Sequence, residues 1–149
     1  MSTRRHRPIM DGREAALQMI YAVDLGGQGA ATVAHWYLQA HPLTEEAAAL
    51  ASALLEAVGD RKDEIEAVIE RHAIGWRLVR MSAVDRSLLK LAVAELLLHP
   101  RASARTVIQA AARLAHKYSQ PEAEAFVRGL LEAVARELAS EPEVIRHAQ

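Results

Sequence analysis

The amino-acid sequence predicts an all-α fold, and three observations lead to that prediction. Alanine is abundant, apolar residues recur three and four positions apart along most of the chain, and no run alternates convincingly with period two. A chain of 149 residues with 51% hydrophobic content suits one compact domain with a sizeable core. We expect about seven helices, separated by glycine, proline and helix-capping residues.

Four helices are expected in the N-terminal half. The first covers Arg13 to Asp24 and ends at Gly26-Gly27, because glycine adopts the left-handed conformation found after helices. A shorter helix lies between this glycine-rich linker and Pro42. Thr44 suits the N-cap of the third helix, which breaks or kinks at Gly59-Asp60. The fourth carries an apolar stripe made of Ile65, Val68 and Ile69.

The most apolar helix of the chain is expected from Ser82 to about His99. Ser82 can cap its first turn while Asp85 returns a bond to the Ser82 N–H, which is the pattern of a capping box. A helix that is apolar nearly all round lies at the centre of a domain. The connection before it, Ala73 to Met81, places Trp76 in the core and joins two helical subdomains.

Two amphipathic helices complete the expected fold, the first from Ser103 to Lys117 and the second from Gln120 to Leu138. Gly129 interrupts the second helix at a cost of about 1 kcal/mol relative to alanine. We interpret this glycine as a point of close approach to a neighbouring helix.

Composition argues against several functional classes. The chain has no cysteine, hence no disulfide or thiolate metal site, and with no signal peptide this fits a reducing cytoplasm. No apolar run approaches the roughly 20 residues that span a bilayer. The seven histidines show no metal-binding spacing, and H-E-x-x-H and G-x-S-x-G motifs are absent. We therefore expect no catalytic residue, no metal, no cofactor and no membrane insertion.

The formal net charge is −1, so any nucleic-acid site must come from local clusters of basic residues. One cluster opens the chain, where a single acid accompanies Arg4, Arg5, Arg7 and Arg13. Guanidinium groups pair with phosphates and stack on unpaired bases. We expect residues 1–12 to form a basic arm, with a solvated tail as the alternative, before a helical domain at 13–140 and a tail at 141–149.

A second basic cluster follows from helical spacing. Every fourth residue of the expected 103–117 helix is polar or basic on the face opposite its apolar stripe: Arg105, Gln109, Arg113 and Lys117. Tyr118 comes directly afterwards and offers a ring for base stacking. The alternative is that Tyr118 fills the edge of the core.

Three stretches of the chain, in this order, resemble the NusB family. They are GREAALQMIYAVDL at 12–25, GWRLVRMSAVDRSLLKLAVAEL at 75–96 and TVIQAAARLAHKYSQPEAEAFVRGLLEAV at 106–134. The resemblance implies two small helical bundles that share one core. It also implies an RNA-binding factor of transcription antitermination, which acts with NusE, a small-subunit ribosomal protein, on the boxA element of ribosomal RNA leaders.

The resemblance further implies roles for single residues. Tyr21 is implied to lie near the RNA, although it also shares the apolar stripe of the first helix. Asp85 and Arg86 match an acidic-basic pair that is implied to face NusE. Glu122 is implied to lie near the RNA and partner surface, with capping of Ser119 as the alternative. The expected RNA-binding set is Arg4, Arg5, Arg7, Arg13, Tyr21, Arg105, Arg113, Lys117 and Tyr118, and the partner-binding set is Asp85, Arg86 and Glu122.

The chain also departs from the family pattern. Met10-Asp11-Gly12 displaces the basic cluster upstream, Ala94 and Arg128 replace a usual tyrosine and asparagine, and Ala110 and Arg113 stand where two acids are usual. These changes leave open a divergent paralogue that acts as a scaffold or dimer without RNA. A second alternative is the RNA-binding module found before certain rRNA methyltransferases, working here with a separate enzyme because the chain lacks room for a cofactor domain. Expected partners are single-stranded boxA-type RNA, NusE, the transcription elongation complex and a second copy of the chain.

Overall fold

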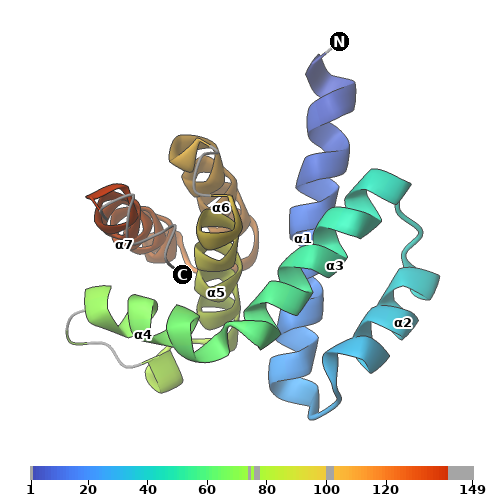
Figure 1. Ribbon diagram of the computed structural model, residues 1–149, viewed down its shortest axis with the longest axis horizontal. Helices are drawn as coiled ribbons and strands as arrows, with labels where there is room; N and C mark the ends of the chain where they lie inside the picture. The colour runs from blue at the N-terminus through green and yellow to red at the C-terminus, as the bar shows by residue number, and fades with distance from the viewer. Residues whose placement is uncertain (1, 74, 76–77, 100–102, 141–149) are drawn as a thin grey trace.

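The computed structural model describes residues 2–73, 75, 78–99 and 103–140, and these residues form helices and no strand. Figure 1 shows the helices in chain order. Their bounds are α1 Ser2–Gly26, α2 Ala30–Ala40, α3 Glu45–Asp60, α4 Lys62–His72, the short 3-10 helix η1 Leu78–Arg80, α5 Ala83–Leu98, α6 Ala104–Tyr118 and α7 Pro121–Ser140. The prediction of an all-α fold with seven α-helices is confirmed.

The helices form two groups with α5 between them (Figure 1). Helices α1, α2 and α3 pack together on one side, while α4, α6 and α7 surround α5 on the other. Helix α5 contacts α1 and α3 as well, and its side chains Leu88, Leu89 and Val93 are fully buried. One continuous core therefore joins both groups, as expected for the central helix. Trp76, predicted to lie in the core, falls outside the described residues.

Local capping follows the sequence closely. The Thr44 hydroxyl accepts a bond from the Ala47 N–H at 3.1 Å, and the Ser82 hydroxyl accepts one from the Asp85 N–H at 3.1 Å. Gly27 has φ +71°, the left-handed conformation expected after α1. The expected capping box is wrong in its second half, because the Asp85 carboxylate accepts a 2.6 Å bond from the Ser119 hydroxyl instead.

Helix α1 is longer than predicted. The sequence predicts a start at Arg13, but helical backbone extends back to Ser2 and so includes the residues predicted to form an arm. In Figure 1 this N-terminal part continues beyond the neighbouring helices. Arg4, Arg5 and Arg7 belong to the first turns of α1, and their side chains fall outside the described part of the structure.

Arg13 lies inside the protein, which differs from its expected place at an RNA-facing surface. The residue is 8% exposed, and its Nε and Nη2 donate to the two carboxylate oxygens of Glu95 at 2.8 and 2.7 Å. Glu95 belongs to α5, so this paired hydrogen bond joins α1 to the central helix. A guanidinium held in this way has little freedom to reach a phosphate.

The close approach between helices occurs at Gly12 and not at Gly129. A Cβ placed on Gly12 would lie 2.9 Å from the Ala47 carbonyl oxygen and 3.1 Å from the Leu50 side chain, whereas Gly129 has open space there. The prediction for Gly129 is therefore wrong, since this residue lies on the exposed face of α7. Gly12 lets α1 pack directly on the backbone of α3.

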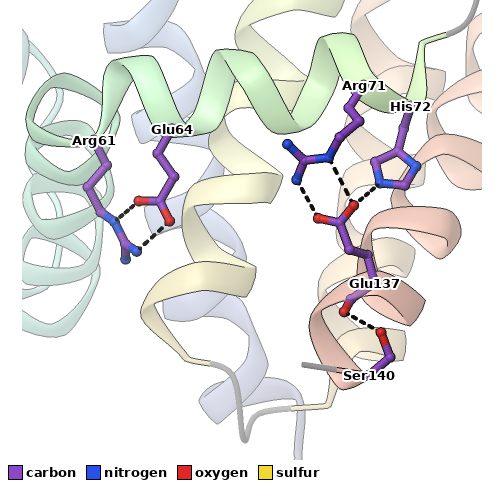
Figure 2. A network of polar contacts seen from close by, with 6 residues as sticks. All are labelled: Arg61, Glu64, Arg71, His72, Glu137 and Ser140. Carbon is purple, nitrogen blue, oxygen red and sulfur yellow. Dashed lines mark hydrogen bonds and ion pairs between the residues drawn. The ribbon is translucent and has the colours of Figure 1, made fainter. Parts of the chain in front are cut away.

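A polar cluster joins α4 to α7 (Figure 2). Glu137 accepts bonds from Arg71 Nε at 3.0 Å and Nη2 at 2.5 Å, and one of its oxygens lies 2.9 Å from His72 Nε2. The hydrogen bond from Arg71 is the main cause that lowers the pKa of Glu137, against an opposing effect of burial. The cluster fixes the outer edge of the second group of helices.

Removing either partner of the Arg13–Glu95 pair should destabilise the protein. We expect Arg13→Ala or Glu95→Ala to lower the free energy of unfolding by about 3–5 kcal/mol, because the remaining charge is buried without a partner. The double variant R13M/E95L should recover most of that loss. Urea unfolding followed by circular dichroism measures both. Arg61→Ala, which removes an exposed ion pair with Glu64, is the control and should cost less than about 1 kcal/mol. If Arg13→Ala destabilises the protein no more than Arg61→Ala does, the prediction is wrong.

The two glycines should respond in opposite ways to alanine. Gly12→Ala should destabilise the protein by about 1–3 kcal/mol, since the added methyl group collides with backbone of α3. Gly129→Ala should stabilise it by up to about 1 kcal/mol, because alanine favours the helix and nothing obstructs it. Thermal unfolding of both variants tests this, and a stabilising Gly12→Ala would show that α1 and α3 can separate without cost.

Candidate nucleic-acid interface

One face of α6 presents a row of polar and basic side chains. Ser103 caps the helix by accepting from the Thr106 N–H at 3.4 Å, and Val107, Ala111 and Leu114 are buried on the inner face. The outer face carries four exposed residues one turn apart: Arg105, Gln109, Arg113 and Lys117. At 1.5 Å per residue this row is about 18 Å long. It can contact several neighbouring phosphates.

The end of this row meets α1. Lys117 Nζ lies 2.5 Å from the Glu14 carboxylate, and the Tyr118 hydroxyl donates to the same oxygen of Glu14. Gln18, one turn further along α1, donates to the Tyr118 hydroxyl at 2.8 Å and accepts from the Tyr37 hydroxyl at 2.5 Å. Hydrogen bonds thus connect α6, α1 and α2 in one chain.

This network changes the acidity of its members. Burial alone would raise the pKa of Glu14, but the hydrogen bonds from Lys117 and Tyr118 and the positive charge of Lys117 outweigh it, so the pKa lies below the usual range. Burial, followed by the hydrogen bond to Glu14, raises the pKa of Tyr118. Burial and the nearby Tyr118 and Glu14 raise the pKa of Tyr37. Glu14 is held as a carboxylate and the tyrosines as neutral phenols.

Tyr21 and Tyr118, about a hundred positions apart in the chain, line the same recess. Leu17, Gln18 and Val84 form the rest of its wall, so the recess is mainly apolar. Tyr21 is 37% exposed and Tyr118 is half-buried. An aromatic wall that is partly open to solvent can stack against an unpaired base.

Two of the three expected partner-binding residues come together in a neighbouring groove. Asp85 and Glu122 line it with Arg80, Gln120 and Phe126. Ser119 binds Asp85 and directly follows Tyr118, so this groove adjoins the aromatic recess. Capping of Ser119 by Glu122 is ruled out, because the Ser119 N–H donates to the Ala115 carbonyl at 2.8 Å.

Arg86, the third expected partner-binding residue, points elsewhere. Its Nη2 lies 2.5 Å from the Asp24 carboxylate, and its Nη1 donates to the Met81 carbonyl at 3.1 Å. These contacts hold the end of α1 against the start of α5. Arg86 therefore supports the fold near the groove and does not line it.

Sequence reasoning missed Glu14 and Gln18, the two α1 residues that organise the recess. A signal was available, because Glu14, Gln18 and Tyr21 are spaced four and three apart and so share one face of a helix. The clustering of that face with Lys117 depends on tertiary packing. Within the described ranges, no three histidine, aspartate or glutamate side chains gather as a metal site, and no helix is long and apolar enough to cross a membrane.

The fold and this surface define a small all-helical binding domain, with a cationic helix face beside an aromatic recess. The NusB family model matches residues 10–136. A transcription antitermination protein NusB of Koribacter versatilis is 39% identical over 87% of this chain and 89% of its own length. The NusB of Myxococcus xanthus is 38% identical over 83% and 91%. The chain belongs to the NusB family.

Solved structures agree with this assignment. A chain in a crystal structure of a plectonemic RNA supercoil has a TM-score of 0.86 and 26% identity, covering 91% of this chain and 99% of that one. A chain from a crystal structure of the antitermination factors NusB and NusE in complex with dsRNA has a TM-score of 0.81 and 26% identity, covering 88% and 98%. The expected NusB-like fold is therefore confirmed.

The Glu14 network should make stability depend on acid pH. Because the pKa of Glu14 is lowered on folding, its contribution is present above the unfolded pKa of about 4.3 and is lost as pH falls through the folded value. In Glu14→Gln, the fall in unfolding midpoint between neutral and acid pH should be smaller than in the wild type. Tyr118→Phe, which removes one of the two bonds, should reduce it only partly. Parallel urea-midpoint curves for wild type and Glu14→Gln would refute the role of this network.

Proposed function

We propose that this protein is an RNA-binding transcription antitermination factor that acts together with NusE. The observation that carries the proposal is the meeting of the α6 basic row with the recess lined by Tyr21 and Tyr118. Family membership and the structural neighbour that contains NusB, NusE and RNA support it. We further propose that the RNA is a single-stranded boxA-type element of an rRNA leader, and that the complex joins the transcription elongation complex in the bacterial cytoplasm.

The two parts of this surface have different tasks. Arg105, Arg113 and Lys117 pair with phosphates, which positions the strand without reading its sequence. Tyr21 and Tyr118 stack against an unpaired base, worth roughly 1–3 kcal/mol per base. A single strand with unstacked bases can make both the phosphate contacts and the stacking contacts, because a duplex keeps its bases stacked within the helix. No catalytic step is part of the proposal, and the protein acts by binding.

NusE is proposed to bind at the groove that contains Asp85 and Glu122. Ser119 connects this groove to Tyr118, so a partner seated there lies beside the proposed RNA path. A partner that adds its own phosphate contacts raises affinity by holding the RNA at two linked sites. This arrangement suits a protein whose net charge is −1 and whose own basic contacts are few. Arg4, Arg5 and Arg7 remain proposed phosphate contacts at the start of α1.

Charge reversal on α6 should weaken RNA binding. We expect Arg113→Glu to lower affinity for a boxA-type RNA by about tenfold, or 1.4 kcal/mol, because a phosphate contact is replaced by repulsion. The plot of log K against log salt should become less steep, its negative slope decreasing in magnitude by about 0.7 for each lost contact to a single strand. Fluorescence anisotropy with labelled RNA, at several salt concentrations and with and without NusE, measures both quantities.

Lys62→Glu is the matched control, since Lys62 is exposed at the start of α4 and lines a groove whose described residues include none of α6. It makes the same change of charge and should leave RNA affinity nearly unchanged. A scrambled single strand and a duplex of the same sequence test the preference for boxA. Normal RNA binding by Arg113→Glu would disprove the assigned surface, and NusE binding without any RNA binding by the wild type would favour the scaffold alternative.

A further inference from the structure

A second basic surface lies where α6 meets α7. A shallow groove between these helices is lined by Arg105, Ile108, Gln109, Arg128, Glu132, Ala135 and Arg136. Among the described residues, the lining carries three guanidinium groups and one carboxylate, a surplus of two positive charges in a protein of net charge −1. Buried Ile108 and half-buried Ala135 form an apolar floor beneath the charged side chains.

The arginines of this groove differ from those that hold the fold together. Arg13, Arg61 and Arg86 each form an ion pair with a carboxylate, at 2.7, 2.7 and 2.5 Å respectively. Arg105, Arg128 and Arg136 have no such partner among the residues that the structure describes, and all three are exposed. Even Glu132, on the same groove wall, is not paired with them.

Unpaired like charges around a groove raise the local positive potential and favour an anionic ligand. A guanidinium presents several donors in one plane, which matches the oxygens of a phosphate. Simple solvation is the alternative explanation for exposed arginines on a helix. The groove differs from a merely solvated face because the charged residues come from two helices and line one groove together with apolar residues.

We propose that the α6–α7 groove binds phosphates of the RNA segment that flanks the recognised element. The inference rests on the proposed function and extends it. Arg105 and Gln109 belong both to the groove and to the exposed row on α6, so the two surfaces are continuous. A strand that leaves the recess at Tyr118 passes Lys117 and Arg113 and reaches the groove at the other end of α6. Arg128 and Arg136 on α7 then contact its backbone without reading bases.

The test compares a short boxA-type RNA with the same RNA extended by a run of uridines, at each end in turn. For the wild type, one of the extended RNAs should bind about tenfold more tightly than the short RNA, with a steeper salt slope. The double variant R128Q/R136Q should lose that gain and leave the affinity for the short RNA unchanged. Glutamine retains helix propensity and both positions are exposed, so the fold should persist.

Two controls sharpen the comparison. Lys62→Gln removes an exposed charge from α4 and should keep the gain from the extended RNA. Glu132→Gln removes the one carboxylate among the described residues that line the groove and should enlarge that gain. Both changes leave the α6 row intact, so binding of the short RNA reports on the proposed function alone.

The outcomes separate the two proposals. If neither extension improves binding to the wild type, or if R128Q/R136Q retains the gain, the groove proposal is wrong while the proposed function stands. If R128Q/R136Q weakens NusE binding but not RNA binding, the groove is a protein-binding surface and the proposal is also wrong. If the short RNA does not bind, the proposed function fails, and the groove proposal is then decided by whether the wild type binds the extended RNA more tightly than the variant does.

Discussion

The buried ion pair between Arg13 and Glu95 sets how α1 packs on α5, and the rest of the structure depends on that packing. Two charges removed from water are tolerated only when their hydrogen bonds are well formed, and here both carboxylate oxygens accept from one guanidinium. That requirement fixes the position of α1 along the central helix α5 and the rotation of α1 about its own axis. Consecutive residues on a helix are rotated by about 100°. Once Arg13 is fixed, its neighbours must face particular helices.

Three consecutive residues of α1 therefore make three different helix contacts. Gly12 lies against the backbone of α3, Arg13 pairs with α5, and Glu14 binds Lys117 and Tyr118 of α6. The last contact places Gln18 and Tyr21, one and two turns further on, beside the end of the α6 basic row. The candidate site thus lies where the two groups of helices meet, and α1 contributes to the core and to the surface at once.

Most helices, and the hydroxyl caps at Thr44 and Ser82, were predictable because they depend on local spacing. Apolar residues three and four apart revealed the buried faces, and Thr44 and Ser82 reach donors only three residues away. Contacts between distant residues were not predictable in the same way. In the sequence, Arg13 belongs to a cluster of arginines that is typical of phosphate binding. Only its partner Glu95, 82 positions away, shows that it is buried. Likewise, a helical glycine does not reveal by itself whether another helix approaches it, so the close approach predicted at Gly129 is wrong and the one at Gly12 was not predicted.

The distribution of partners among the basic residues also bears on how the proposed surface works. Lys117 lies at the end of the α6 row that adjoins the aromatic recess, yet it is already bound to Glu14, so a phosphate must compete with that carboxylate for the same ammonium group. Arg113, one turn away, forms no ion pair with any residue that the structure describes and faces no such competition. Binding should then be strongest along the middle of α6 and weaker at the recess, where base stacking and a partner protein have to supply the rest. The proposed surface therefore favours an RNA that combines phosphate contacts along α6, base stacking at the recess and contact with the partner protein. An RNA that offers phosphates alone is disfavoured. In the proposed function, the ion pair of Lys117 with Glu14 limits binding to strands that offer phosphates alone, because a free ammonium group there would strengthen binding to every strand equally.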